Sequence, residues 1–145
     1  MNMSSSSLID PVVIPLVDGP RNELEGERPD RQFTVVHRPE LHVWRVDAPR
    51  ARVLLYAGGG YTRIVYDKEG PEVAAWLNGL GIEVNLLIHR MPGADDGKGG
   101  RYPKGIALED GMLALDHLAG AQSDLPLFHF GLSSGGHLAG VMACQ

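Results

Sequence analysis

The sequence contains very little cysteine and has no excess of positive charge. Its single cysteine, Cys144, excludes an internal disulfide framework and a cysteine-based zinc site, and it fits a reducing compartment. The 13 Lys and Arg residues are outnumbered by 18 Asp and Glu, which gives a net charge of −5. Proteins that bind nucleic acid or anionic membrane surfaces normally carry a basic excess or a basic stripe, so we expect neither partner.

Long hydrophobic runs are also absent. The longest apolar stretches, at residues 53–57 and 84–88, are far shorter than the roughly 20 residues that a membrane-spanning helix needs. Residues 1–7 carry no Lys or Arg, and Asp10, Pro11 and Pro15 interrupt the apolar run that follows, so the pattern of a signal peptide is missing. We therefore expect a cytoplasmic protein without a membrane segment.

Glycine, in contrast, is abundant within an otherwise ordinary globular composition. There are 19 glycines among 145 residues, with 43% hydrophobic and 21% charged residues. Residues 1–31 mix Ser, Pro, Gly and charges without a period of 2 or 3.6, which predicts an irregular lead-in. Residues 32–145 then form one domain, an incomplete one for the reasons given below.

Strands alternate with helices in this domain. Alternating apolar runs predict an antiparallel strand pair at residues 33–36 and 41–46. Continuous apolar runs predict strands covered on both faces at residues 53–57, 82–88 and 126–130. Apolar residues spaced by one helical turn predict two helices, at residues 67–80 (Val73, Leu77, Leu80) and at 104–119 (Leu108, Met112, Leu115, Ala119). The alternation predicts an α/β fold with a doubly wound, mostly parallel sheet, whose site lies beyond the carboxyl ends of the strands.

A G-x-S-x-G pattern, Gly131-Leu-Ser133-Ser-Gly135, stands between the last predicted strand and an apolar helix. A tight strand-to-helix turn strains the backbone of the serine, requires small neighbours and presents the hydroxyl above the sheet. The pattern therefore predicts Ser133 as a nucleophile. The alternative is a glycine-rich turn without chemistry, as found in any doubly wound protein.

A second glycine-rich turn, Gly58-Gly59-Gly60, follows the first covered strand. Glycines let backbone N–H groups approach the oxyanion that develops during acyl transfer, and the N–H of Ser134 would be a further donor. The alternative is a phosphate-binding turn. That interpretation is weaker because neither G-x-G-x-x-G nor G-x-x-x-x-G-K-[ST] is present, and residues 61–66 do not begin a helix.

Several separated motifs together resemble the α/β-hydrolase esterases related to acetyl-xylan esterases, over about residues 33–145. The matching segments, in order, are residues 56–61, 67–70, 73–78, 80–82 and 131–139. The resemblance implies the N-terminal half of an α/β-hydrolase sheet, with Ser133 as nucleophile in an elbow bounded by Gly131 and Gly135. It also implies an oxyanion hole made by the N–H groups of Gly59, Gly60 and Ser134. The sequence departs from the usual family pattern at Ala57, where Pro is usual, and at Ser134, where Ala is usual.

The partners of the nucleophile are not evident in the sequence. Only twelve residues follow Ser133, and they include no acid and one histidine, His137, which lies one helical turn away and is a poor base. Five histidines precede Ser133 and are interpreted as hydrogen-bonded or solvated residues: His37, His42, His89, His117 and His129. Of these, His89 is the best placed to replace the missing base, because it stands at a strand end. We therefore expect the N-terminal part of a longer hydrolase, inactive alone and prone to self-association through its incomplete sheet.

The sequence thus predicts a serine ester hydrolase that forms an acyl-enzyme on Ser133. The resemblance implies small-molecule or carbohydrate esters as substrates, with short acyl groups favoured. No cofactor is expected. The acidic residues Asp95, Asp96, Glu109 and Asp110 are interpreted as a solvated loop and a helix start without calcium-loop spacing, so no metal is expected either. Two alternatives stay open: a peptidase of the same fold, and a catalytically inert truncated product or interaction module.

Overall fold

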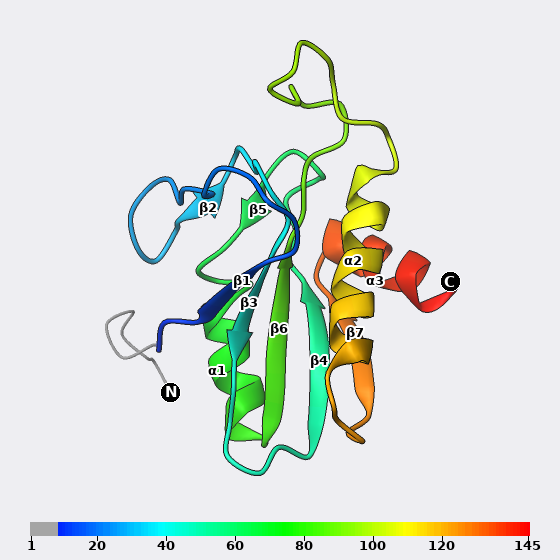
Figure 1. Ribbon diagram of the computed structural model, residues 1–145. Helices are drawn as coiled ribbons and strands as arrows, with labels where there is room; N and C mark the ends of the chain where they lie inside the picture. Colours follow the sequence, from blue (N-terminus) through cyan, green and yellow to red (C-terminus); the bar gives the residue numbers. More distant parts are fainter. Residues whose placement is uncertain (1–8) are drawn as a thin grey trace.

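The structure, a computed structural model, describes residues 9–145 and contains a five-stranded mixed sheet with helices on both faces (Figure 1). The strands are β1 (Val12–Pro15), β2 (Gln32–Phe33), β3 (Glu40–Trp44), β4 (Ala51–Tyr56), β5 (Ile64–Val65), β6 (Ile82–Ile88) and β7 (Leu127–Gly131). The helices are α1 (Pro71–Gly79), α2 (Ile106–Gly120) and α3 (Ser134–Ala143). The large sheet has the order β1-β3-β6-β4-β7, and β2 pairs with β5 in a separate ribbon.

Strand β4 organises the sheet because it is parallel to both of its neighbours, β6 and β7. All six of its residues are buried. Successive side chains of a strand point to opposite faces: Val53 and Leu55 join the core under α1, whereas Leu54 and Tyr56 join the core under α2 and α3. The predicted α/β class and the strands covered on both faces are thus confirmed for β4 and β6.

The helices pack with smaller residues than the apolar stripes predicted. In α2 the buried residues include Ala107, Gly111, Ala114 and Leu118, while the predicted Leu108, Met112 and Leu115 are only partly buried and Ala119 is exposed. A Cβ on Gly111 would lie 2.6 Å from Met142 Sδ, so the small residues let α2 approach α3 closely. In α1, likewise, Ala74 and Leu77 are buried and Val73 is partly buried, but Leu80 lies beyond the helix and is 47% exposed.

The predicted antiparallel pair at residues 33–36 and 41–46 is wrong. Strand β2 pairs with β5, and β3 pairs antiparallel with β6 on one side and β1 on the other. The reason is the packing of Phe33, whose ring meets His42 and Tyr66 edge-on at centroid distances of 5.8 and 5.3 Å. This contact places Phe33 under the face of β3 rather than beside it.

The lead-in is also less irregular than predicted, because Val12–Pro15 forms the edge strand β1. Proline is tolerated there, since an edge strand needs fewer N–H donors. A four-residue strand whose partner lies about 30 residues away leaves no periodic pattern to detect.

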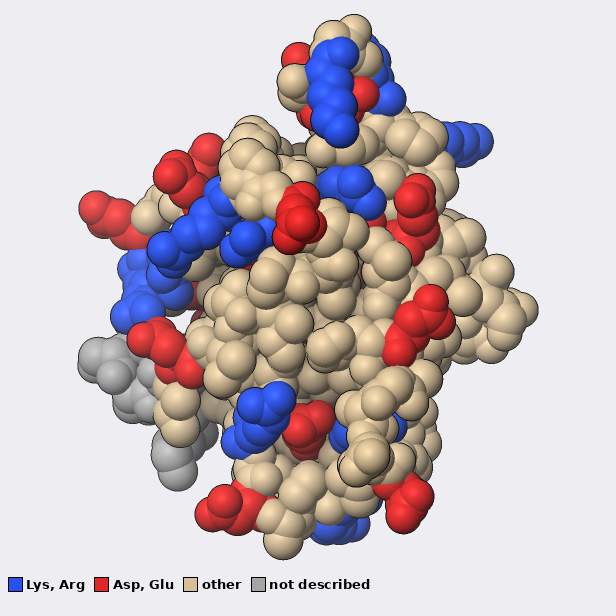
Figure 2. Space-filling view, viewed as in Figure 1, with Lys and Arg blue, Asp and Glu red and all other residues tan. Residues whose placement is uncertain are grey.

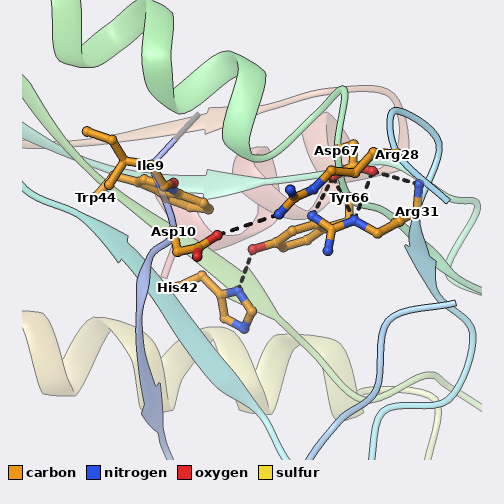
Figure 3. A network of polar contacts seen from close by, with 8 residues as sticks. All are labelled: Ile9, Asp10, Arg28, Arg31, His42, Trp44, Tyr66 and Asp67. Carbon is orange, nitrogen blue, oxygen red and sulfur yellow. Dashed lines mark hydrogen bonds and ion pairs between the residues drawn. The ribbon is translucent and has the colours of Figure 1, made fainter. Parts of the chain in front are cut away.

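Polar contacts fasten the rest of the lead-in to the sheet (Figure 3). The carboxylate of Asp67 accepts the backbone N–H of Arg31 at 2.8 Å and also pairs with the Arg31 guanidinium, while only 4% of the Asp67 side chain is exposed. Trp44 Nε1–H donates to the Ile9 carbonyl at 2.8 Å, and Tyr66 Oη bonds His42 Nδ1 at 2.8 Å. The first residues of the described chain are therefore tied to the same face as α1.

Charges of both signs are interspersed on the face seen in Figure 2, with a broad uncharged area between them. Within residues 9–145, no helix combines the length and the apolar character needed to cross a bilayer.

Replacing Asp67 by Asn should lower the free energy of unfolding by about 2–4 kcal/mol, because it leaves the Arg31 guanidinium without its buried carboxylate. Urea denaturation provides the measurement. The matched control is Asp30→Asn, which breaks the exposed Lys68–Asp30 pair and should cost less than about 1 kcal/mol. Equal losses for the two variants would show that the Arg31–Asp67 pair does not hold the lead-in.

Candidate active site

Ser133 occupies a strained turn between β7 and α3. Its backbone has φ 54° and ψ −124°, in the region that residues other than glycine rarely adopt, at a typical cost of about 1–3 kcal/mol. The first turn of α3 holds it there, since the Ser133 carbonyl accepts the N–H groups of Gly136 and His137 at 2.8 and 3.3 Å. The strained backbone predicted for this serine is present, and the residue is exposed.

Close backbone contacts explain the two glycines of the G-x-S-x-G pattern. A Cβ on Gly131 would overlap the carbonyl oxygen of Gly135. A Cβ on Gly135 would overlap the carbonyl oxygen of Tyr56, at the end of β4. Both positions therefore require glycine for the chain to turn this tightly.

The three-glycine turn lies directly beside Ser133, as expected for two turns at the carboxyl ends of neighbouring parallel strands. Leu132 N–H donates to the Tyr56 carbonyl at 3.0 Å, and a Cβ on Gly58 would lie 3.0 Å from Ser133 Cβ. Gly59 and Gly60 have φ values of 146° and 66°. At Gly59 a Cβ would overlap the carbonyl oxygen of Arg63, so the turn cannot form with a side chain there.

The N–H groups of this turn have different partners. Gly58 N–H donates to Glu69 Oε1 at 2.8 Å, and Gly60 N–H donates to Ser134 Oγ at 3.0 Å. The N–H groups of Gly59 and Ser134 have no acceptor among residues 9–145. Two of the three predicted oxyanion donors are thus available, and the third is occupied by a side chain.

The contact made by Glu69 could not be predicted from the sequence. It depends on the fold of residues 61–70, in which β5 and its flanking turns return the chain to Gly58, and no local pattern predicts that return.

The histidines all bond elsewhere or are exposed. His137 Nδ1 bonds Tyr61 Oη at 2.7 Å, and His89 Nδ1–H donates to the Arg90 carbonyl at 2.9 Å. His42 and His129 bond Tyr66 and Tyr56. No side chain within residues 9–145 forms a hydrogen bond with Ser133 Oγ, so the described chain places no general base against the serine.

Tyr61 is a site residue that the sequence did not reveal. Its backbone has φ 61°, and its ring lies 5.8 Å from the His137 ring and 6.0 Å from the His89 ring, measured between centroids. Burial raises the pKa of its hydroxyl, so Tyr61 stays a neutral phenol. Burial lowers the pKa of His89, which therefore favours the neutral imidazole.

The prediction for one acidic residue is wrong. Asp110, predicted to be solvated, is fully buried and forms a bidentate pair with Arg90, with a shortest distance of 2.6 Å. Asp96 instead accepts backbone N–H groups within its own loop, from Lys98 at 2.7 Å and Gly100 at 3.1 Å. In the part of the chain that the structure describes, no cluster of three or more His, Cys, Asp or Glu side chains could hold a metal ion.

A cavity of about 760 Å³ lies elsewhere, between the lead-in and the face of the sheet that carries α1. Its walls include Arg28, Arg31, His42, Tyr66 and Asp67, several of which appear in Figure 3. Neither glycine-rich turn contributes to it.

Solved structures share this architecture, although no protein-family model matches the sequence and a comparison with curated proteins finds no match. An acetyl ester-xyloside bifunctional hydrolase from Caldicellulosiruptor lactoaceticus aligns with a TM-score of 0.62 and 24% identity, over 93% of this chain and 47% of that one. A soluble variant of monoglyceride lipase from Saccharomyces cerevisiae aligns with a TM-score of 0.54 and 24% identity, over 89% and 40%. A hyperthermophilic esterase from Pyrobaculum calidifontis aligns with a TM-score of 0.57 and 21% identity, over 89% and 40%.

These likenesses establish the fold. Residues 9–145 have the α/β-hydrolase fold, as the resemblance implied, and the neighbours named above are esterases and lipases. The chain spans less than half the length of these three structures.

Replacing Gly135 by Ala should lower the free energy of unfolding by at least about 2 kcal/mol, since the new methyl group overlaps backbone rather than a movable side chain. Gly140→Ala is the matched control in the same helix, because nothing lies within 4 Å of its added Cβ. That change should stabilise the protein by about 0.5–1 kcal/mol through helix propensity. Thermal unfolding measured by circular dichroism compares the two, and a neutral Gly135→Ala variant would contradict the described turn.

The lowered pKa of His89 predicts a pH-dependent stability. Between the folded pKa and the unfolded value near 6.5, only the unfolded chain binds this proton, so the free energy of unfolding falls as the pH falls through that window. His89→Asn cannot titrate and keeps an N–H donor for the Arg90 carbonyl, so its loss of stability from pH 7 to pH 5 should be smaller than in the wild type. Urea denaturation at both pH values tests this, with the exposed His37→Asn as the control expected to lose as much as the wild type.

Proposed function

We propose that the protein is a serine ester hydrolase with Ser133 as its nucleophile. The observation that carries the proposal is the arrangement of this serine: a strained turn presents it beside a glycine-rich turn, with the Gly59 and Ser134 N–H groups free within residues 9–145. A merely structural turn has no need to strain a serine backbone against two unused donors. The esterase and lipase neighbours support the same reaction class.

In this mechanism Ser133 Oγ attacks the carbonyl carbon of an ester, and its proton passes to a general base. The carbonyl oxygen becomes an oxyanion that accepts the N–H groups of Gly59, Gly60 and Ser134. Departure of the alcohol leaves an acyl-enzyme, which water hydrolyses to release the acid. Because no described histidine bonds Ser133 Oγ, we propose that the base and its carboxylate come from outside residues 9–145.

Short acyl groups, including acetyl groups on carbohydrate, are the proposed substrates. The motif resemblance to acetyl-xylan esterases and the acetyl ester-xyloside hydrolase among the structural neighbours both support this class. A cytoplasmic location remains a prediction from the sequence. Self-association also remains a prediction, supported by β7, which pairs with β4 alone within the described chain and exposes 56% of Phe128.

Ser133→Ala should reduce the hydrolysis of p-nitrophenyl acetate at least about 1,000-fold in the protein encoded by the complete gene, because the acyl-enzyme can no longer form. Ser123→Ala is the control, since Ser123 lies in an exposed loop before β7 and should leave the rate unchanged. If Ser133→Ala hydrolysed the ester as fast as the wild type, the nucleophile assignment would be lost.

The two alternatives are separated by related measurements. Faster turnover of an aminoacyl anilide than of an aryl acetate would favour a peptidase of the same fold. A protein whose native mass equals that of these 145 residues, and whose Ser133 does not react with a fluorophosphonate, would favour an inert product or interaction module.

A further inference from the structure

The hydroxyl of Ser134 occupies one of the donors that the proposed mechanism needs. Gly60 N–H donates to Ser134 Oγ at 3.0 Å, across two turns that are 74 residues apart in sequence. We infer that Ser134 Oγ fills the oxyanion position in the substrate-free protein, and that an ester must displace this hydroxyl before its carbonyl oxygen can accept the Gly60 N–H. The inference rests on the proposed function and deepens it, because it assigns a positioning role to a residue next to the nucleophile.

The placement of the oxygen argues for this role. An oxyanion bound by Gly60 and Ser134 must lie within hydrogen-bond distance of both backbone nitrogens. Ser134 Oγ meets the first requirement at 3.0 Å, so it lies where an acceptor bound to Gly60 N–H has to lie. A serine hydroxyl oxygen is an acceptor similar in size to a carbonyl oxygen, so it can stand in for the substrate.

Other contacts already stabilise the turn at Gly58–Gly60, which argues against a purely structural role for the Ser134 hydroxyl. The Gly58 carbonyl accepts Val65 N–H at 3.0 Å, and Gly58 N–H is bound by Glu69. The Gly59 carbonyl accepts Thr62 N–H at 3.2 Å and the Thr62 hydroxyl at 3.1 Å. The turn therefore keeps its shape without the Ser134 hydroxyl, and removing that hydroxyl frees a donor.

The expected size of the effect follows from the nature of the contact. Gly60 is exposed and its bond to Ser134 is between neutral groups, so the exchange of this bond for one to the substrate changes the equilibrium by a factor of about 2 to 10. The hydroxyl thus lowers the affinity of the site by the same factor for every carbonyl oxygen that binds Gly60 N–H.

The test compares four variants of the protein encoded by the complete gene. Ser134→Ala and Ser134→Val remove the hydroxyl, Ser134→Thr keeps it with the shape of valine, and Ser133→Ala removes the nucleophile. The first readout is the second-order rate constant for reaction of Ser133 with a fluorophosphonate, accompanied by kcat and KM for p-nitrophenyl acetate. The second readout is the exchange rate of the Gly60 amide proton, measured by NMR with the Gly59 amide as internal reference.

The inference expects the Ala and Val variants to react with the fluorophosphonate about 2 to 10 times faster than the wild type, with a lower KM for the ester, and the Thr variant to resemble the wild type. Gly60 amide exchange should accelerate in the Ala and Val variants while Gly59 is unchanged. Slower or unchanged phosphonylation in Ser134→Ala would overturn the inference and leave Ser133 as the nucleophile. Equal reactivity of the wild type and Ser133→Ala would instead overturn the proposed function, and the inference with it.

Discussion

The rest of the candidate site depends on the contact between Gly135 and the end of β4. Because no Cβ intervenes, the first turn of α3 rests directly on the carbonyl oxygen of Tyr56. This contact fixes the distance between the two glycine-rich turns and so places Ser133 beside Gly58. The strain at Ser133 is sustained by the same contact, since the helix cannot move away from the strand to relax it without losing its packing.

The sheet supplies the framework for that contact. Strands β4 and β7 run parallel and in register from Arg52 and Leu127 to Tyr56 and Gly131, so both turns begin at the same edge. The two cores clamp β4 from opposite faces, because its side chains alternate between them. The position of β4 thus determines where both glycine-rich turns begin.

The sequence predicted the elements that depend on local pattern and missed those that depend on distant partners. Apolar runs located β4, β6 and β7 to within two residues, whereas α1 begins at Pro71, four residues after the predicted start at residue 67. Strand β1 and the β2–β5 pair were missed because their pairing is decided by the packing of Phe33 and by contacts across the chain. In the candidate site, Gly131 and Gly135 could be predicted from the sequence because the tight turn leaves no room for a side chain at either position. The contacts of Glu69, Tyr61 and the Ser134 hydroxyl could not be predicted, because each joins side chains or amides that only the folded chain brings together.

The wide separation of β4 and β7 in the sequence affects the order in which parts of the chain fold during synthesis. Tyr56 and His129, which join these strands by a hydrogen bond, are 73 residues apart. On the ribosome, β4 emerges together with β3 and β6 but has to wait for α2 and β7 before its second edge is paired. The serine turn is therefore among the last parts of the described chain to take shape during translation. Until then, the unpaired edge of β4 exposes backbone N–H and C=O groups to which molecular chaperones could bind.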